Sequence, residues 1–513
     1  MLRKIVFATG ASTGVGGAIY YAIQRKGKEP TVLEQLPSKI DLPDKVQYLV
    51  VGGGASTYGA YRAIRAFDPK AQVLIVGEEK HLPYMKSPLS KELWQGNELN
   101  ENLTFKQWNG RNRSIMFEHS EYFSSLEAIK KKEPGVAYVG GLKVVEVDPE
   151  KKLVYFANGN KLEYGSCLLA PGSINTGHPV LSKIPEIEPF LVQLQRIEDF
   201  QSLQKSAMES TSIAIVGGGS IASELAVNMA AFAKRANPNL QVVQVFPEAG
   251  NMCSLLPEYM AKWLTRQIAA EGVKVLSGTD IVDAVVVNIK SKKQVRLRLT
   301  SGEEITVDRI AIATAAKPNI DFAQKSGLEV DQINGGIVVN AEFQARKDLY
   351  VAGDASSFFD EQLGRRRMQS HDHGIATGRI AGRNMAGGQK SYSKQSIMWC
   401  DVGNIASFEG VGILDPKLET YSVFFPENPQ ERPDFNGKIS KGVIFYKNKK
   451  NIVVGILLCN TFARLADAEK VIAEQRPLDL KDVAKIFYEK PVIEDLIKQD
   501  PKSDAAETKK TKK

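Results

Sequence analysis

Two runs of three glycines stand out in the sequence because of what precedes and follows them. VQYLVVGGG at 46–54 and SIAIVGGGS at 212–220 each join an apolar run, typical of a buried strand, to a helical pattern. Glycine at such a turn lets backbone amides approach an anion, and the positive end of the following helix favours a pyrophosphate there. An acidic residue after the next strand accepts hydrogen bonds from ribose hydroxyls. The sequence therefore predicts two dinucleotide-binding units; a tight turn without a ligand is the alternative for each.

In the first unit, two glycines and one acidic residue are the candidates for cofactor binding. Gly52 and Gly54 end the apolar run, and Glu78 closes the next one, QVLIVGE. This order places the glycines at the pyrophosphate and the Glu78 carboxylate at the ribose hydroxyls of an adenosine. Thr57 stands where a third glycine or alanine is usual, and its larger side chain is expected to crowd the contact between helix and strand.

The second unit repeats this arrangement with GxGxxA spacing. Gly217 and Gly219 are its candidate pyrophosphate glycines, Ala222 takes the third position, and the apolar run QVVQVF leads to Glu248. A carboxylate at this place repels the 2′-phosphate that distinguishes NADPH from NADH. We therefore expect the second unit to prefer NADH.

A third motif indicates which nucleotide stays bound. DLYVAGDAS at 348–356 predicts a short strand ending in Gly353 and Asp354, followed by a helix from His371 onward. In flavoenzymes with two dinucleotide sites, an aspartate in this place binds the ribitol of FAD; an ordinary strand-end aspartate is the alternative. The order of the three motifs predicts resident FAD, NADH as the substrate, and an NADH-binding unit inserted into the FAD-binding domain. No cysteine pair adjoins the first helix, so electrons are expected to leave the flavin directly.

Apolar runs rich in Val, Ile and Leu alternate with helical patterns along most of the chain, which is typical of parallel sheets covered by helices. A chain of 513 residues is also too long for a single core. The predicted fold class is α/β, with two Rossmann-like dinucleotide-binding domains in a glutathione-reductase-like arrangement and a C-terminal α/β domain. The predicted divisions are a membrane anchor or targeting segment at 1–28, a linker at 29–44, the FAD-binding domain at 45–178 and 316–395, the NADH-binding domain at 179–315, the C-terminal domain at 396–490 and a basic tail at 491–513.

The formal net charge of +8 comes from the two ends of the chain. Residues 1–28 carry five basic and no acidic side chains, and residues 501–513 carry five basic and two acidic ones, so the part between them is neutral. Attraction to nucleic acid or anionic lipid must then come from the ends or from a local patch. Residues 5–23 contain no charge, which predicts a marginal membrane anchor, a cleaved targeting segment or a soluble helix.

The remaining polar clusters are too small to define further sites. Four scattered cysteines and five histidines exclude a disulfide scaffold and a zinc module, and the pair at His371 and His373 is too small for a metal site. The three arginines at 365–367 are interpreted as a solvated loop, with a nuclear-import or nucleic-acid patch as the alternative.

Several long stretches resemble the apoptosis-inducing factor family of mitochondrial FAD-dependent NADH oxidoreductases. The most specific are LPYMKSPLSKELW at 82–94, LTFKQWNGRNRSI at 103–115 and FPEAGNM at 246–252, and the resemblance covers about 44–490. It implies a tightly bound FAD, slow oxidation of NADH and a place in the mitochondrial intermembrane space or on the inner membrane. It also implies a partnership with the mitochondrial import oxidoreductase that serves the respiratory chain, homodimer formation on reduction, and DNA binding in the nucleus after release in apoptosis.

The resemblance also implies roles for individual residues. Lys91 matches the lysine that faces the flavin and Glu224 the glutamate paired with it, and we expect both to be catalytic; a solvated surface pair is the alternative. Lys86 stands where the family usually has arginine, so a forked phosphate contact becomes a point charge. Trp399 matches a tryptophan near the nicotinamide, with an ordinary core aromatic as the alternative. The expected flavin site comprises Gly52, Gly54, Glu78, Lys86, Lys91, Val144, Gly353 and Asp354.

The departures from the family pattern gather where NADH should bind. Ser220 replaces an aromatic that stacks on the nicotinamide, and Ser370 replaces a histidine, with Gln369 before it in place of an acid. Ala315 replaces a glycine, and residues 253–254 (Cys-Ser) replace a Gly-Lys pair. These differences favour an alternative function, in which the protein is an FAD-containing scaffold with weak or lost NADH activity that acts through protein or DNA contacts.

Overall fold

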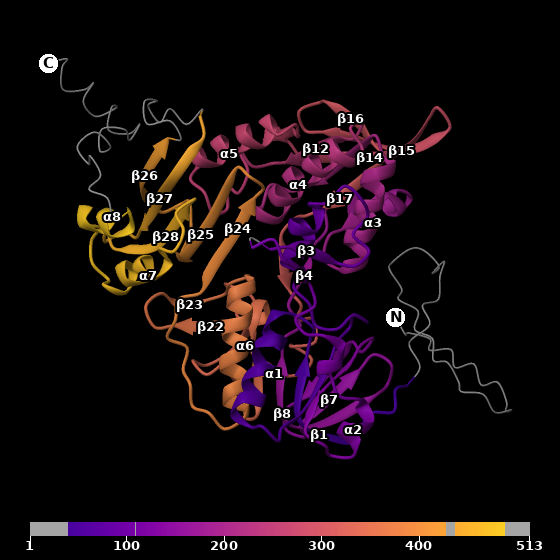
Figure 1. Ribbon diagram of the computed structural model, residues 1–513, viewed down its shortest axis with the longest axis vertical. Helices are drawn as coiled ribbons and strands as arrows, with labels where there is room; N and C mark the ends of the chain where they lie inside the picture. The colour runs from indigo at the N-terminus through magenta and orange to yellow at the C-terminus, as the bar shows by residue number, and fades with distance from the viewer. Residues whose placement is uncertain (1–38, 108, 427–436, 488–513) are drawn as a thin grey trace, which may run out of the picture.

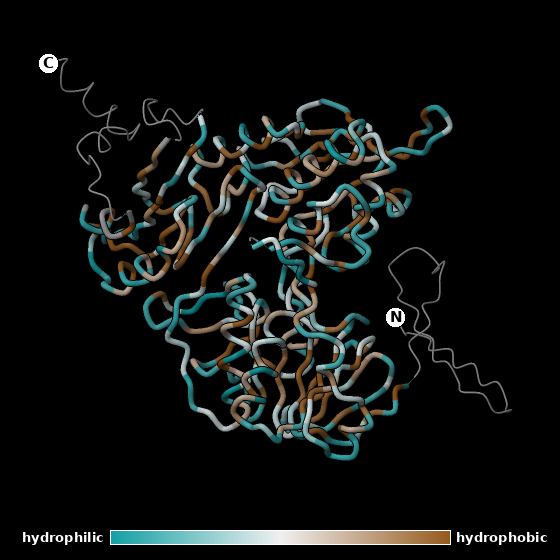
Figure 2. Tube along the Cα trace, in the orientation of Figure 1, coloured by the Kyte–Doolittle hydropathy of each residue, from teal (hydrophilic) through white to brown (hydrophobic). Residues whose placement is uncertain are grey.

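The computed structural model describes residues 39–107, 109–426 and 437–487. Figure 1 shows three groups of strands, with the first group below and the other two above it. In Figure 2 the hydrophobic segments follow the strands, and the hydrophilic ones lie mainly in the outer loops.

The first sheet has the order β20-β21-β8-β1-β2-β5, and the pairs that join β21, β8, β1, β2 and β5 are parallel. Leu49 and Val50 in β1 are fully buried, as expected for a central strand covered on both faces. The strands come from two separate parts of the chain, so the sheet is discontinuous in sequence. They are β1 (Lys45–Val51), β2 (Gln72–Val76), β5 (Gly135–Val139), β6 (Val144–Asp148), β7 (Leu153–Phe156), β8 (Lys161–Leu169), β20 (Gln344–Arg346) and β21 (Leu349–Val351).

Two helices from opposite ends of this discontinuous unit lie side by side, α1 (Ala55–Phe67) and α6 (His371–Met385) (Figure 1). Their contact depends on glycine. A Cβ at Gly378 of α6 would lie 2.0 Å from the Ser56 carbonyl oxygen of α1, and a Cβ at Gly59 of α1 would lie 2.3 Å from the Ile375 carbonyl oxygen of α6. The two backbones therefore approach more closely than any larger residue allows.

The second sheet, with order β10-β17-β11-β12-β13, is wholly parallel. The chain enters the second unit through β9 and leaves it through β18, and these two strands pair as an antiparallel ribbon. The bounds are β9 (Ser173–Asn175), β10 (Leu191–Gln193), α3 (Ile197–Glu209), β11 (Ser212–Val216), α4 (Ser220–Ala236), β12 (Gln241–Phe246), α5 (Glu258–Ala270), β13 (Lys274–Ser277), β17 (Arg309–Ile312) and β18 (Ala316–Pro318), with a separate antiparallel sheet of β14 (Ile281–Ile289), β15 (Lys292–Leu299) and β16 (Glu304–Val307).

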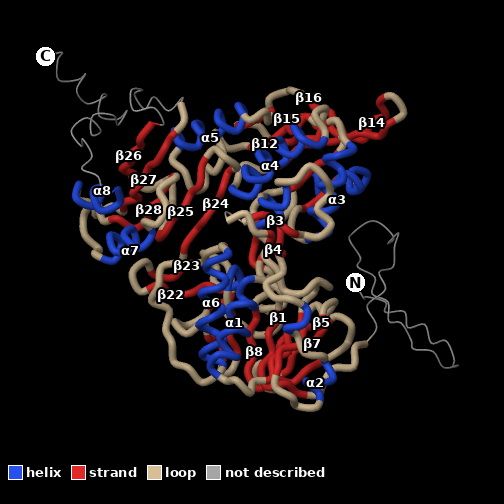
Figure 3. Tube along the Cα trace, in the orientation of Figure 1, coloured by secondary structure: helices blue, strands red, loops and turns tan. Residues whose placement is uncertain are grey.

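The third sheet is antiparallel, with order β24-β25-β28-β27-β26 (Figure 3). One apolar core contains Leu225 of α4, Trp263 of α5 and Phe408 of β25, so this sheet packs directly on the helices of the second unit. The bounds are β24 (Ile397–Val402), β25 (Ala406–Gly412), β26 (Glu419–Pro426), β27 (Ile439–Lys447), β28 (Val453–Cys459), α7 (Leu465–Ala473) and α8 (Leu480–Phe487).

Short elements complete the described chain. They are β3 (Thr104–Lys106), β4 (Asn112–Ser114), α2 (Leu126–Lys130), β19 (Ile337–Val338), β22 (Ser356–Asp360) and β23 (Gly364–Arg366).

The fold agrees with the predicted α/β class and with the additional C-terminal domain. Each of the three large sheets draws its strands from one predicted domain, although the domain boundaries themselves stay a prediction. The predicted anchor at 1–28, most of the linker and the basic tail lie outside the described residues. Within the described ranges, no helix is long and apolar enough to cross a membrane.

Candidate functional site

A cavity of about 450 Å³ lies where the first unit, α4 and β24 meet. Nine of the residues predicted to act at the flavin or the nicotinamide line it, although they come from distant parts of the sequence. They are Gly52, Gly54, Glu78, Lys86, Lys91, Val144, Glu224, Asp354 and Trp399.

The first glycine turn brings the start of α1 to this cavity. Gly52 has a φ of +122°, and a Cβ there would lie 2.1 Å from the Ala170 carbonyl oxygen. Gly54 caps α1 without a side-chain hydrogen bond, and no acidic residue lies in the first turn. The first-turn amides therefore have no anionic side-chain partner at the helix N-terminus, where an anion such as a pyrophosphate is favoured.

Thr57 behaves differently from the prediction. Its side chain is fully buried, and its hydroxyl donates to the Gly52 carbonyl oxygen at 2.9 Å. This hydrogen bond therefore stabilises the glycine turn against the start of α1. The close approach that requires glycine lies further along α1, where Gly59 contacts α6.

Asp354 lies at the far end of β21, in the short 3-10 helix Gly353–Ala355. Gly353 has a φ of +68°, and a Cβ there would lie 2.3 Å from the Ser56 hydroxyl. The Asp354 carboxylate accepts a hydrogen bond from Ser173 at 2.8 Å. Burial raises the pKa of Asp354, and the Ser173 hydrogen bond and the Arg367 charge offset only part of this effect. A half-buried carboxylate beside a cavity suits hydroxyl donors such as those of a ribitol.

Glu78, another residue of the cavity wall, lies beside two cations. Its Oε1 accepts from Arg196 Nη2 at 3.0 Å, and Lys143 Nζ lies 4.0 Å away. Both cations line the cavity. The sequence argument missed Arg196 and Lys143, because neither belongs to a local motif.

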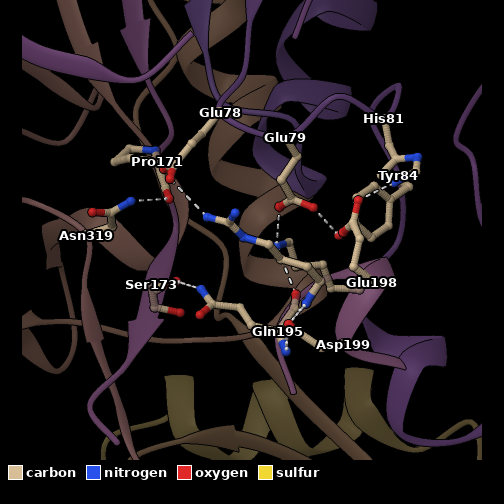
Figure 4. Close-up of polar contacts among 12 residues, drawn as sticks. Glu78, Glu79, His81, Tyr84, Pro171, Ser173, Gln195, Glu198, Asp199 and Asn319 are labelled. Atoms are coloured by element: carbon tan, nitrogen blue, oxygen red, sulfur yellow. Dashed lines mark hydrogen bonds and ion pairs between the residues drawn. The ribbon is translucent and has the colours of Figure 1, made fainter. Parts of the chain in front are cut away.

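Lys86 is hydrogen-bonded to residues of both the first and the second unit. Its Nζ donates to Glu79 Oε1 at 2.8 Å and to the Gln195 carbonyl oxygen at 3.1 Å. Glu79 also accepts from Tyr84 at 2.5 Å (Figure 4). The ammonium is therefore held at the cavity wall as a point charge, as the change from arginine predicts.

Lys91 and Glu224 form a buried ion pair. Lys91 Nζ lies 2.9 Å from Glu224 Oε1, and the two side chains are 7% and 5% exposed, so the alternative of a solvated surface pair is wrong. Glu224 also accepts from Ser90 Oγ at 2.6 Å and from the Asp401 amide at 3.2 Å. Burial alone would lower the pKa of Lys91, but the charge and hydrogen bond of Glu224 outweigh it and raise that pKa. The ammonium is thus kept charged at the cavity.

Trp399 of β24 is no ordinary core aromatic, because it is 37% exposed. Its ring centroid lies 3.9 Å from Lys91 Nζ, in cation–π contact. The side chain covers the ammonium on the side of the cavity formed by the third sheet.

Of the residues that depart from the family pattern, Ser220 and Ser370 line the cavity and Ala315 does not. Ser220 starts α4 and lines the cavity, so the lost aromatic leaves a small side chain there. Ser370 also lines the cavity, but its hydroxyl caps α6 by accepting from the His373 amide at 3.0 Å and donates to the Ile397 carbonyl oxygen at 2.7 Å. Ala315 is exposed and does not line the cavity.

The second glycine turn lies next to the cavity rather than in its wall. Gly217 follows β11 with a φ of +131°, and Gly219 caps α4 without a side-chain hydrogen bond. Glu248 is exposed and follows β12, which pairs in parallel with β11. These three residues therefore share one edge of the second sheet. Gly353, which was predicted for the flavin site, does not line the cavity either, but it lies directly before Asp354.

The interpretation of arginines 365–367 as a solvated loop is wrong. Arg365 Nη1 donates to the Ser357 carbonyl oxygen at 2.7 Å, Arg366 Nη2 to the Gly412 carbonyl oxygen at 2.7 Å, and Arg367 Nε to the Asn334 carbonyl oxygen at 2.9 Å. The guanidinium groups tie β23 to neighbouring segments, because a planar fork of donors satisfies several carbonyl oxygens at once. They are therefore structural.

The donor set of the cavity fits FAD. Unpaired helix amides and Lys86 suit a pyrophosphate, Glu78 suits a ribose, and Asp354 suits a ribitol. Within the described ranges, no three His, Cys, Asp or Glu side chains are grouped to hold a metal ion.

Comparisons with known proteins agree with this geometry. Residues 46–378 match the family model described as pyridine nucleotide-disulphide oxidoreductase, and residues 381–438 match the model for apoptosis-inducing factor, mitochondrion-associated, C-term. A Drosophila melanogaster protein named as apoptosis-inducing factor 1, mitochondrial, is 39% identical over 88% of this chain, which spans 66% of that relative's length. The Dictyostelium discoideum apoptosis-inducing factor 1, mitochondrial, is 32% identical over 89% of this chain and 84% of its own length.

Among solved structures, a ferredoxin reductase from Rhodopseudomonas palustris has the same fold, with a TM-score of 0.68, 19% identity, and coverage of 86% of this chain and 98% of its own. The matched oxidoreductase model and relatives make the chain an FAD-dependent NAD(P)H oxidoreductase, with FAD as cofactor and NADH as substrate. The match to the C-terminal family model, together with the identity to these two relatives over most of the chain, shows that the chain belongs to the apoptosis-inducing factor family.

Proposed function

We propose that this protein oxidises NADH slowly in a mitochondrion, with FAD bound in the 450 Å³ cavity and NADH entering from the side of α4. The observation that carries the proposal is that one cavity is lined by the uncapped start of α1, the start of α4, and the Lys91–Glu224 pair. Two helix N-termini directed at one space suit two pyrophosphate-containing ligands.

The first unit supplies the groups that would hold FAD. The amides after Gly52 and Gly54, together with Lys86, would bind the pyrophosphate; Glu78 and Arg196 would meet the adenosine ribose, and Asp354 the ribitol. Val144 lines the same wall. Bound FAD supplies an acceptor for the hydride of NADH.

Lys91 would stabilise the negative charge that hydride transfer brings into the cavity. Glu224 holds the ammonium in place through a charge-assisted hydrogen bond, and Trp399 shields it from water. An ordered cation in a dry site acts more strongly than one in solvent, since little reorganisation is needed during reaction. This assigns catalytic roles to Lys91 and Glu224.

The second unit would bind NADH through Gly217 and Gly219, and Glu248 would exclude the 2′-phosphate of NADPH. Ser220 cannot stack on a nicotinamide ring as an aromatic would. We therefore expect weak docking of the nicotinamide and slow turnover.

The competing function is a flavin-containing scaffold that does not use NADH efficiently. An anaerobic titration of the purified yellow protein separates the two. Loss of the flavin absorbance on addition of NADH, with a weaker response to NADPH, supports the oxidoreductase. A flavin spectrum that millimolar NADH leaves unchanged would support the scaffold.

Ser220→Phe is expected to lower the KM for NADH. Stacking of a base-like ring on an aromatic contributes about 1–3 kcal/mol, which corresponds to about 5- to 150-fold in affinity. Steady-state kinetics with NADH measures the change. Ser220→Ala is the control, because it removes the hydroxyl without adding a ring and should leave KM close to that of the wild type. An unchanged or higher KM in Ser220→Phe would contradict the prediction.

We place this activity in the intermembrane space or on the inner membrane, in support of the respiratory chain, with release to the nucleus in apoptosis. The resemblance and the names of the relatives support this assignment. Membrane anchoring would depend on residues 1–28, and the mitochondrial import oxidoreductase and a second copy on reduction are the proposed partners. Because arginines 365–367 are bound to carbonyl oxygens, DNA binding would depend on the basic ends. DNA binding unchanged by deletion of 501–513 would contradict that role for the tail.

A further inference from the structure

Glu92 is a half-buried acidic residue for which the proposed reaction provides no role. It follows Lys91 and starts the short 3-10 helix Glu92–Trp94, whose other residues, Leu93 and Trp94, are almost fully buried. Its Oε2 is inaccessible to solvent and has no hydrogen-bond partner within the described structure. A carboxylate in this position would be costly, because burial disfavours the charged form and the one backbone hydrogen bond to this group, from the Glu92 amide, offsets only part of that cost.

The charges around Glu92 add to this cost. It faces Lys91 beside it, Glu224 from α4 and Asp401 from β24. The one cation of this group, Lys91, is already hydrogen-bonded to Glu224 at 2.9 Å. Burial raises the pKa of Glu92. The Lys91 charge and a hydrogen bond from the Glu92 amide lower it in part, and Glu224 and Asp401 raise it further. Two carboxylates that compete for one ammonium cannot both be ionised at low cost.

We propose that Glu92 is a positioning residue that carries a proton beside the Lys91–Glu224 pair, so that the Lys91 ammonium acts with a single counter-ion. When Glu92 loses this proton to solvent at higher pH, a second negative charge faces Lys91 and weakens its stabilisation of negative charge at the cavity. The flavin then becomes harder to reduce. This inference rests on the proposed role of Lys91.

The first test uses the oxidised holoprotein and does not depend on NADH. Infrared difference spectra during a pH titration should show the carbonyl stretch of protonated carboxylic acids. Other carboxyl groups with a raised pKa, such as Glu409, also contribute, so Glu92→Gln should remove one component of this band. The stability of the protein should also depend on pH through the titration of Glu92. Since the folded-state pKa of Glu92 is raised, its contribution is present below the unfolded pKa and is lost as pH rises through the folded pKa. Glu92→Gln should abolish this component of the dependence of Tm on pH.

The second test measures the midpoint potential of the flavin in the holoprotein against pH. Reduction of a flavin takes up protons, so its potential falls with pH in every variant. The wild type should show an additional fall across the titration of Glu92, and Glu92→Gln, which mimics the neutral acid, should lack this additional fall. Glu409→Gln is the matched control. Glu409 also has a buried carboxyl oxygen without a partner and a pKa raised by burial, but it faces Asp401 and Asp372 rather than Lys91. It should keep the wild-type fall in potential.

The outcomes distinguish this inference from the proposed function. If Glu92→Gln keeps the full wild-type infrared band and the additional fall in potential, the inference is overturned, even if NADH reduces the flavin normally. Loss of both in Glu92→Gln, but not in Glu409→Gln, supports it. Failure of NADH to reduce the wild type would contradict the proposed function alone, because the infrared test needs no NADH.

Discussion

Gly378→Ala is expected to destabilise the flavin unit by about 3 kcal/mol, the upper end of the usual cost of overpacking. The added Cβ would lie 2.0 Å from the Ser56 carbonyl oxygen and 2.7 Å from its carbonyl carbon. Both are backbone atoms of α1, so no side-chain rotation relieves the contact and one helix must move. Thermal or urea unfolding of the purified variant measures the loss.

The same change should release the cofactor. Gly54, Ala55 and Ser56 at the start of α1 line the cavity, so a displaced α1 no longer presents its amides to a pyrophosphate. The ratio of flavin to protein absorbance after purification should fall well below that of the wild type. Gly96→Ala is the control, since Gly96 is exposed and a Cβ there would have its nearest neighbour at 3.8 Å. Wild-type stability and full flavin content in Gly378→Ala would show that the helices have room to adjust.

The parts of the fold that the sequence predicted are those with a local pattern. An apolar run before three glycines predicts a buried strand, a turn and a helix, and this holds at both 52–54 and 217–219. The order of the motifs also predicted that the first sheet would be completed by a later segment, and β21 does pair with β8. Such features follow from neighbouring residues, so one sequence suffices to predict them.

The contacts that the sequence did not predict join residues that are far apart along the chain. Glu78 and Arg196 are separated by 118 positions, and Lys86 reaches a carbonyl oxygen 109 positions away. No spacing rule connects them. The prediction for the arginines at 365–367 was wrong for a related reason. A run of like charges is usually solvated, but here each guanidinium group donates to a carbonyl oxygen that only the folded chain brings close.

The Lys91–Glu224 pair is intermediate between these cases, because resemblance predicted the partners, 133 positions apart, but not their burial. The burial of the pair determines how much stability the protein should lose when one partner is removed. Glu224→Gln removes the hydrogen-bonded counter-charge of the Lys91 ammonium in a dry site, where Glu92 could ionise in its place. Loss of one partner of a buried pair costs up to about 3–5 kcal/mol. Glu303→Ala is the control: it breaks the Lys274–Glu303 pair, in which both side chains are more than 40% exposed, and should cost less than about 1 kcal/mol.

Combining Glu224→Gln with Lys91→Met should separate stability from chemistry. The double variant has no buried charge at this place. The single glutamine oxygen can still accept from Ser90 or from the Asp401 amide, which bind different oxygens of Glu224, so we expect part of the lost stability to return. Reduction of the flavin by NADH should not return, because the ammonium that would stabilise the incoming charge is absent. Unfolding curves and anaerobic stopped-flow kinetics measure the two quantities on the same samples. A stable double variant that is reduced at the wild-type rate would show that the pair is structural, and the catalytic role assigned to Lys91 would then be wrong.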